Sequence, residues 1–157
     1  MPSTSLPPPV ASATCRLVRG PAELDAHLAV RRAIFVELQG LFADDDRDAR
    51  DDEPATLHAV AEAGGEIVGA VRLYPLGGGE WKGDRLAVLP SARVHRLGAR
   101  LVQFAVRTAG ARGGRRMVAQ VQLPNVRFFE RLGWARDGEP GLYHGVMHQP
   151  MTIPLGR

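Results

Sequence analysis

The sequence predicts an α/β fold, in which strands and helices alternate along a chain of 157 residues. Two observations carry this prediction. Strand-like runs and helix-like spacings of apolar residues follow one another from residue 14 onward. Between two of the strand-like runs stands Gly64-Gly65, which is typical of a tight antiparallel hairpin because glycine accepts positive φ. We therefore expect about six to seven strands, with an antiparallel pair at the glycine hairpin and helices packed on the sheet.

The first half of the chain supplies three predicted strands and one helix. Residues 14–18 form the first strand. A helix begins at Pro21, because proline suits the first helical position, and apolar residues recur at helical spacing as far as Phe35. Residues 56–63 and 67–73 flank the glycine pair, so they form second and third strands that run antiparallel.

The second half supplies two further strands, two helices and a C-terminal strand region. Residues 81–88 form the fourth strand and residues 116–122 the fifth. A short helix over residues 125–132 ends at Gly133, and one or two strands follow from Trp134 onward. The helix between the fourth and fifth strands is indicated by residues that recur at helical spacing, namely Leu97, Leu101, Phe104, Ala105 and Thr108.

Residues 1–14 are predicted to be a flexible leader, followed by a single domain over residues 15–157. The leader contains four prolines and no charged side chain, so it can neither continue a helix nor bury much apolar surface. It lacks the basic and apolar regions of a secretory signal, and the chain has no run of about 18 apolar residues typical of a membrane span. We therefore expect a cytoplasmic protein without a membrane partner.

Cys15 is the only cysteine of the chain. An intrachain disulfide is therefore excluded, and a cysteine-based metal site cannot be assembled within one chain. We predict no metal site. The sequence leaves open whether the chain forms a homodimer.

Charge is distributed unevenly along the chain, although the net charge is only +3. Residues 37–53 contain eight acidic residues and two arginines, whereas residues 93–131 contain nine arginines and one glutamate. The basic segment suits nucleic acid or a smaller polyanion. Because the chain has no zinc-finger spacing and no aromatic signature of RNA-binding domains, we predict no nucleic-acid partner.

The connection between the fourth strand and the following helix has the composition of a phosphate site. The first turn of a helix offers backbone N–H groups without intrahelical partners, and the helix dipole is positive there. Arg93 and Arg96 add positive charge, and Gly98 allows a ligand to approach the backbone closely. The alternative is that Gly98 is only a helix-packing position and that both arginines are solvated.

The segment Arg93-Val94-His95-Arg96-Leu97-Gly98-Ala99 resembles the pyrophosphate loop of the GCN5-related N-acetyltransferase (GNAT) superfamily. The pattern of that loop is Gln or Arg, two residues, Gly, one residue, then Gly or Ala. Arg93 and Gly98 match this pattern. Arg96 stands where the family usually has its first glycine, and it adds a candidate phosphate ligand.

Further segments resemble the same superfamily. The segment QLPNVRFFERLGW, which begins at Gln122, is similar to the region of the family that runs from an asparagine to FYEKLGF, and Gln122 falls at the asparagine position. Residues 30–42, 71–75 and 145–148 are similar to the ElaA-like branch and to acetyltransferase-like proteins of nitrogen-starvation gene clusters. A more distant similarity is to acyl-homoserine-lactone synthases.

The resemblance implies the GNAT fold, a splayed mixed sheet flanked by about four helices, and an N-acetyltransferase that uses acetyl-CoA to modify a small amine. Pantetheine is expected between the fourth and fifth strands, paired with the main chain of the fourth like an added strand. The pyrophosphate is expected on the amides of residues 94–99. The implied cofactor-binding residues are Leu86, Ala87, Val88, Arg93, Val94, His95, Arg96, Leu97, Gly98, Ala99, Gln122, Asn125, Phe128 and Phe129.

The implied reaction is direct attack of the amine on the thioester, helped by positioning and proton transfer. Many relatives have a tyrosine at the position of Phe129 that is thought to protonate the leaving thiolate, and phenylalanine has no proton to give. Tyr143, His144 and His148 are the nearest alternatives in the sequence. We take Tyr143 and His148 as candidate catalytic residues. Protonation by solvent, with structural roles for these side chains, is the competing interpretation.

Two other functions stay open at this stage. The absence of a phenol at Phe129 suits a CoA-binding or regulatory protein that has lost catalysis. An acyltransferase that uses another acyl carrier is the other alternative. Release of CoA only in the presence of an amine separates the enzyme from the binding protein.

The acidic run over residues 43–53 does not fit a calcium-binding EF-hand. An EF-hand loop that starts at Asp44 places Ala49 at the glycine position and Ala55 at the bidentate glutamate position. We predict a solvated loop with internal ion pairs. The functional alternative is that the loop lies near the acceptor entrance and favours a cationic amine.

Three charged residues outside that run receive structural predictions. The similarity to acyl-homoserine-lactone synthases implies that Arg72 helps to shape the substrate side, and the alternative is a structural pair between Arg72 and an aspartate. Asp84 and Glu37 are weak candidates for a general base, and we predict that they are salt-bridge partners.

Overall fold

The computed structural model of the protein describes residues 13–156, without the side chains of Val94 and His95. Eight strands in this part of the chain form one sheet in the order β1-β2-β3-β4-β5-β8-β6, with β7 paired to β8. Neighbouring strands run antiparallel except β4 and β5, which are parallel. The strands are β1 (Thr14–Leu17), β2 (Leu57–Ala63), β3 (Glu66–Gly77), β4 (Glu80–Val88), β5 (Arg116–Gln122), β6 (Ala135–Arg136), β7 (Gly141–Tyr143) and β8 (Val146–Pro154).

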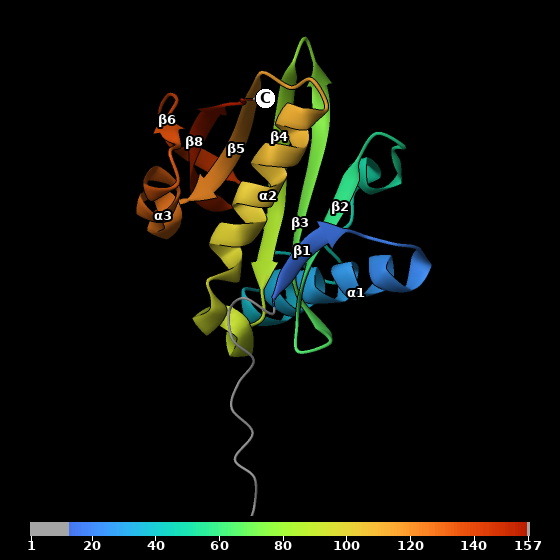
Figure 1. Cartoon of the computed structure of the whole chain (residues 1–157). Coiled ribbons are helices and arrows are strands. Elements are labelled where there is room, and N and C mark those ends of the chain that lie inside the picture. Colours follow the sequence, from blue (N-terminus) through green and yellow to red (C-terminus); the bar gives the residue numbers. More distant parts are fainter. Residues whose placement is uncertain (1–12, 157) are drawn as a thin grey trace, which may run out of the picture.

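Three α-helices lie within the described residues: α1 (Pro21–Arg32), α2 (Leu97–Ala111) and α3 (Val126–Arg131). Figure 1 shows α2 lying along the sheet next to β4, with α1 near β1 and α3 near β6. Pro21 occupies the first position of α1, as predicted, and α1 continues directly into the π-helix η2 (Ala33–Leu38). None of the helices between residues 13 and 156 is long and apolar enough to cross a bilayer.

Two apolar clusters form the core, one against each long helix. Successive side chains of a strand point to opposite faces of the sheet, so neighbouring residues of β3 belong to different clusters. The cluster on α2 includes Val71, Leu73, Leu97, Leu101 and Ala105. The cluster on α1 includes Val30, Ile34, Phe35, Ala70 and Ala87.

The predicted fold class is confirmed, and the hairpin at Gly64-Gly65 forms as expected. Ala63 pairs with Glu66 across the turn, and Gly65 adopts a φ of 83°. β5 has the predicted bounds, whereas the region after Trp134 forms three strands instead of one or two. β6 and β7 contain two and three residues, which is too short for an alternation pattern to reveal them.

Three α-helices, rather than about four, lie in the described part of the chain. After α1, the chain forms the π-helix η2 and then the 3-10 turn η3 (Ala49–Asp52) instead of a further α-helix. In η3 the Asp48 side chain accepts a hydrogen bond from the Arg50 backbone N–H at 3.0 Å and closes a capping box with Asp51. The capping box therefore stabilises the start of this short 3-10 turn.

Most of the predicted leader, residues 1–14, lies outside the described residues. Its last two residues are ordered, because Ala13 is buried and Thr14 begins β1. The Nη2 atom of Arg100 donates a hydrogen bond to the carbonyl oxygen of Ala13 at 2.7 Å. Ala13 and Thr14 therefore belong to the folded domain, although the predicted boundary placed them in the leader.

The divergence of β4 and β5 shapes the centre of the molecule. The two strands pair only through Glu80–Arg116, Trp81–Met117 and Lys82–Val118. Beyond these pairs β4 stays bonded to β3 and β5 stays bonded to β8. The facing edges of β4 and β5 therefore separate, and within the described chain their main-chain groups have no strand partner there.

Candidate functional site

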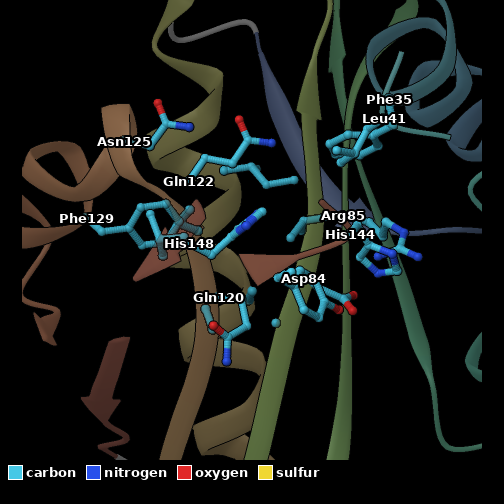
Figure 2. Close-up of a pocket in the computed structure, with 18 of the residues that line it drawn as sticks. Phe35, Leu41, Asp84, Arg85, Gln120, Gln122, Asn125, Phe129, His144 and His148 are labelled. Carbon is cyan, nitrogen blue, oxygen red and sulfur yellow. The ribbon is translucent and has the colours of Figure 1, made fainter. Parts of the chain in front are cut away.

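A cavity of about 140 Å³ occupies the gap between the diverging strands. Its inner end lies next to the last β4–β5 pair, where Gly83 and Ala119 line it. Gln122 and Asn125 line it at the other end of β5. Figure 2 shows side chains that approach this space from both strands and from the C-terminal hairpin, which contributes His144.

A β-bulge in β4 places a buried arginine on the cavity wall. Asp84 pairs with Arg72 and Ala87 pairs with Ala70, so two residues of β4 face one residue of β3 between these pairs. Arg85 lies in this bulge with a φ of 54°. Because a bulge interrupts the alternation of side chains, the consecutive residues Asp84 and Arg85 join the same network of charges.

The guanidinium group of Arg72 contacts three carboxylates. Its Nε and Nη2 atoms donate to the two oxygens of Asp84 at 2.8 and 2.7 Å, and Nη1 donates to Asp48 at 2.6 Å. Nη1 also lies 3.1 Å from Oδ2 of Asp51. Burial opposes the charged form of Arg72, but the surrounding carboxylates outweigh it and raise the pKa of this side chain.

Asp46 connects two further buried arginines to this network. Its Oδ2 atom accepts a hydrogen bond from Nε of Arg31 at 2.8 Å and lies 3.2 Å from Nε of Arg85. Arg31 also donates to both oxygens of Asp51, at 2.7 and 3.0 Å. We call the connected set the ion cluster; it consists of Arg31, Arg72, Arg85, Asp46, Asp48, Asp51 and Asp84.

The prediction of a solvated acidic loop is wrong for two of its aspartates. The side chain of Asp46 is fully buried, and that of Asp51 is 3% exposed. Burial raises the pKa of the Asp51 carboxyl, but hydrogen bonds from His58 and Arg31 outweigh it and hold this pKa well below its usual range. The arginines that neutralise these aspartates come from distant parts of the sequence, so the local acidic composition did not reveal them.

Other predictions about charged residues are confirmed. Arg72 pairs with aspartates, and Asp84 is one of its partners. Glu37 lies 3.8 Å from Arg32 on the surface. Internal ion pairs also exist in the exposed part of the acidic loop, for example between Arg47 and Asp52 at 3.8 Å.

His27 is fully buried beside the ion cluster. Its Nδ1 atom donates to the carbonyl oxygen of Ala59 at 2.9 Å, and its Nε2 atom accepts from Nη1 of Arg31 at 3.3 Å. These two contacts require a neutral ring, because Nε2 must keep its lone pair. Burial, together with the charge of Arg31, lowers the pKa of His27 from 6.5 to about 3.

We expect the free energy of unfolding to fall as the pH is lowered from 6.5 toward about 3. The folded pKa of His27 lies below the unfolded value, so over this range only the unfolded chain binds the proton. The slope from one histidine is at most about 1.4 kcal/mol per pH unit. Urea unfolding of the wild type and His27→Asn at about pH 7 and pH 4.5 measures the effect. The variant, whose amide can still donate to Ala59, should lose less stability, and equal losses would contradict the assignment.

His148 projects from β8 into the cavity and is 4% exposed. Its Nδ1 atom lies 2.7 Å from the carbonyl oxygen of Val146, and a carbonyl can only accept, so Nδ1 carries the hydrogen. In the neutral ring Nε2 is then the basic nitrogen. Figure 2 shows the ring between Phe129 on one side and Arg85 with His144 on the other. This geometry suits a proton acceptor inside the cavity.

Tyr143 lies beside His148 in a row of rings on the cavity wall. The ring centroid of Tyr143 lies 4.4 Å from that of His144 and 5.2 Å from that of His148. The ring centroids of His144 and Phe42 are 4.8 Å apart. Nζ of Lys82 donates to the phenol oxygen of Tyr143 at 3.4 Å. Because the oxygen accepts from an ammonium group, the phenol hydrogen is left to donate elsewhere. Burial lowers the pKa of His144.

Phe129 of α3 lines the cavity and is 9% exposed. Its ring packs edge to face against Trp134 at 5.3 Å and against Phe128 at 5.4 Å. Phe129 therefore contributes apolar surface and no proton at this position.

The predicted phosphate segment lies where the 3-10 helix η4 (Pro90–His95) meets α2. Arg96 caps α2 with a left-handed φ of 55°, and Arg93 and Arg96 are both exposed, whereas Leu97 is buried. Within the described residues, α2 has no side-chain cap and no acidic residue in its first turn. Its first N–H groups therefore suit an anion.

Gly98 faces the end of β4 and the side of α3. A Cβ atom at this position would lie 3.6 Å from Cζ of Phe128 and 3.9 Å from Cγ2 of Val88, which is ordinary contact. The packing of the protein therefore does not itself require glycine here. The absence of a side chain is better explained by a ligand that approaches the backbone.

The structure brings candidates from distant segments together, although not all of them reach the cavity. Ala87 belongs instead to the core beneath α1. Among the described side chains, Arg93, residues 96–99 and Phe128 do not line the cavity, and Gly98 lies near Phe128 and Val88. The candidates that line the cavity are Leu86, Gln122, Asn125, Phe129, Tyr143 and His148.

The sequence profile of the acetyltransferase (GNAT) family matches residues 26–134. The chain belongs to this family. Its structure is also similar to that of a Lactobacillus plantarum protein named for a proposed N-acetyltransferase activity, with a TM-score of 0.82 and 26% identity, over 92% of this chain and 99% of that one. The predicted GNAT membership and the enzyme class, an acyltransferase, are thereby confirmed.

Two further solved structures share the fold of this GNAT protein. Escherichia coli ElaA has a TM-score of 0.78 at 19% identity, over 89% of this chain and 98% of that one. An aminoglycoside 6'-N-acetyltransferase complexed with coenzyme A has a TM-score of 0.73 at 18% identity, over 90% of this chain and 96% of that one. These two likenesses show the shared fold, and the family match makes the chain a GNAT acyltransferase.

Several residues that line the cavity were not predicted from the sequence. Arg85 was not singled out, because a bulge without glycine leaves no local pattern. Phe42 lines the cavity beside the guanidinium of Arg85, whose Cζ lies 4.9 Å from the ring centroid. Gln39 also lines it and accepts a hydrogen bond from Nε2 of Gln122 at 3.1 Å. The aromatic residues in the helical run before the acidic loop were the feature of the sequence that could have indicated this side of the cavity.

Proposed function

We propose that this GNAT enzyme transfers an acetyl group from acetyl-CoA to the amine of a small-molecule acceptor, by direct attack of the amine in a ternary complex. The observation that carries the proposal is the gap between β4 and β5, where an unpaired strand edge faces a cavity. An extended amide-bearing chain such as pantetheine can bind such an edge as an additional strand. The proposal keeps the cytoplasmic location expected from the sequence.

The residues around the gap suit each part of the donor. The main chain of Leu86, Ala87 and Val88 would hold pantetheine, and the amides at the uncapped start of α2 would hold the pyrophosphate. Arg93 and Arg96 would add charge-assisted contacts to phosphate oxygens. Gln122 and Asn125, which line the end of the cavity on β5, would border the donor there.

When bound, acetyl-CoA supplies an acyl group that is activated as a thioester. The acceptor nitrogen forms the new C–N bond, the C–S bond breaks, and Nε2 of His148 accepts the proton that the amine loses. The phenol of Tyr143, held by Lys82, donates a proton to the departing thiolate. Solvent is the competing donor, because a thiolate needs little acid help near neutral pH.

The charges around the cavity favour an amine as acceptor. The ion cluster contains three arginines and four aspartates, which leaves one net negative charge. Asp84 of this cluster lines the cavity. The carboxylate of Asp84 can attract a cationic amine, and Arg85 on the same wall offsets part of its charge. The volume of about 140 Å³ suits a small acceptor.

A CoA-binding protein without catalysis is the second candidate function, and Phe129 is the observation that favours it. The ring is packed and has no proton to give. An acyl carrier other than CoA is the remaining alternative. It would place its acyl group in the same gap between β4 and β5, but it would not need a pyrophosphate site at the uncapped start of α2.

A turnover assay with acetyl-CoA and a broad panel of small amines tests the proposed function. We expect free CoA thiol to appear only when an accepted amine is present. Tight binding of CoA without turnover across the panel would favour the binding protein. A protein that does not bind CoA would contradict the proposed function.

Arg93→Ala is expected to weaken acetyl-CoA binding by about 1 to 3 kcal/mol with little effect on the fold, if Arg93 makes a charge-assisted phosphate contact. Isothermal titration calorimetry gives the dissociation constant. Arg112→Ala is the matched control, because Arg112 is an exposed arginine at the opposite end of α2. Equal affinities of the two variants for acetyl-CoA would show that Arg93 does not contact the phosphates.

Gly98→Val is expected to abolish detectable CoA binding while the protein stays folded, because a Cβ atom there meets only ordinary contacts in the protein, whereas the side chain blocks approach to the backbone. Gly110→Val shows the contrasting behaviour of a packing glycine. A Cβ at Gly110 would lie 2.2 Å from the carbonyl oxygen of Gly156, so this variant should lose stability. Circular dichroism and calorimetry measure both properties, and unimpaired binding by Gly98→Val would support the packing alternative.

A further inference from the structure

A second cavity of about 230 Å³ lies behind the first, on the α2 side of the sheet. The two cavities share two wall residues, Val102 of α2 and Trp134. The second cavity is lined by apolar side chains such as Leu132 and Ile153, and the exposed side chains of Gln103 and Arg107 also line it. These two side chains therefore belong to the walls of both spaces.

The shared wall stands at the inner end of the first cavity. Ala135, which follows Trp134, pairs with Thr152 of β8. Thr152 pairs with Val118, and Val118 pairs with Lys82 in the last β4–β5 pair. Trp134 is therefore next to the register at which β4 and β5 separate. If the proposed function holds, an acyl group that extends from the thioester toward this inner end meets Trp134.

The indole of Trp134 contributes bulk to the shared wall. The side chain is 4% exposed, its ring packs edge to face on Phe129 at 5.3 Å, and its backbone N–H donates to the carbonyl oxygen of Phe129 at 3.1 Å. Among the described residues, Nε1 has no hydrogen-bond partner. Since a buried donor without a partner is unfavourable, the bulk of the indole is a better explanation for this residue than its polarity.

We propose that Trp134, with Val102, sets the length of the acyl group that the donor site accepts. The wall closes the inner end behind a short acyl group, and the second cavity is apolar space that a linear acyl chain of several more carbons could occupy if the wall were opened. This inference rests on the proposed function, because it assumes an acyl-CoA donor in the β4–β5 gap.

Calorimetric titration with CoA, acetyl-CoA and octanoyl-CoA tests the proposal without an acceptor. In the wild type, acetyl-CoA should bind at least as tightly as octanoyl-CoA. In Trp134→Ala, the ratio of the octanoyl-CoA to the acetyl-CoA dissociation constant should fall at least about tenfold, because added methylenes become buried. Val102→Ala thins the same wall from α2 and should give a smaller fall.

Leu132→Ala is the matched control, because Leu132 lines only the second cavity and its truncation leaves the wall in place. Its ratio should equal that of the wild type. An unchanged ratio in Trp134→Ala would overturn the proposal, and Val102→Ala decides in the same way if the tryptophan variant does not fold. A wild type that prefers octanoyl-CoA would also overturn it. Failure of the wild type to bind CoA would contradict the proposed function, whereas normal CoA binding with unchanged ratios contradicts this inference alone.

Discussion

Replacing His148 by glutamine is expected to lower kcat about 100-fold or more while the affinity for acetyl-CoA stays nearly unchanged. The imidazole Nε2 is the basic nitrogen because Nδ1 is committed to the carbonyl oxygen of Val146 at 2.7 Å. Glutamine has a similar volume and places its amide near the position of Nε2, but it cannot accept a proton near neutral pH. Steady-state kinetics with an accepted amine, together with calorimetry, separates the rate from the affinity.

Two neighbouring variants sharpen this test. Tyr143→Phe should lower kcat strongly if the phenol protonates the thiolate, and it should be nearly silent if solvent does so. Phe129→Tyr is expected to raise the rate modestly in the second case by adding a donor near sulfur. A His148→Gln variant with a nearly normal rate would contradict the assigned proton acceptor.

Replacing Arg72 by methionine is expected to lower the free energy of unfolding by about 3 to 5 kcal/mol. The guanidinium lies between three carboxylates, and Asp51 and Asp84 are only 3% and 9% exposed. Removing the cation leaves Asp84 without its bidentate partner and takes one of the cations away from Asp51, and burying an uncompensated charge is costly. Chemical denaturation at neutral pH measures the loss.

Arg47→Met provides the matched control for that loss. Arg47 forms a 3.8 Å pair with Asp52, with side chains 49% and 81% exposed, so its removal should cost less than about 1 kcal/mol. Arg72→Lys should fall between the two variants, because an ammonium keeps the charge but cannot bind Asp84 through two parallel hydrogen bonds. If Arg72→Met and Arg47→Met lower the free energy of unfolding by similar amounts, the ion cluster does not stabilise the fold more than an exposed ion pair does.

The sequence predicted those parts of the fold that local patterns determine. The glycine pair fixed the β2–β3 hairpin, and β5 has the predicted bounds. Tyr143 and His148 were chosen because they lie near the last strands, and both line the cavity. In each of these cases, residues close in sequence carry the necessary information.

The parts that the sequence did not predict depend on contacts between distant segments. Asp46 looked solvated within its acidic run, yet its partners Arg31 and Arg85 come from α1 and β4. The bulge at Arg85 uses positive φ without glycine, so no composition signal marks it. The role of Trp134 as a shared wall appears only after α2 and the C-terminal region pack together.

A crystal structure of the protein with acetyl-CoA tests the central claim most directly. The account predicts pantetheine between β4 and β5 alongside Leu86, Ala87 and Val88, with the pyrophosphate at the start of α2 next to Gly98. It also predicts the acetyl group in the cavity within reach of His148. Acetyl-CoA bound at another surface, with the β4–β5 gap free of ligand, would contradict the account.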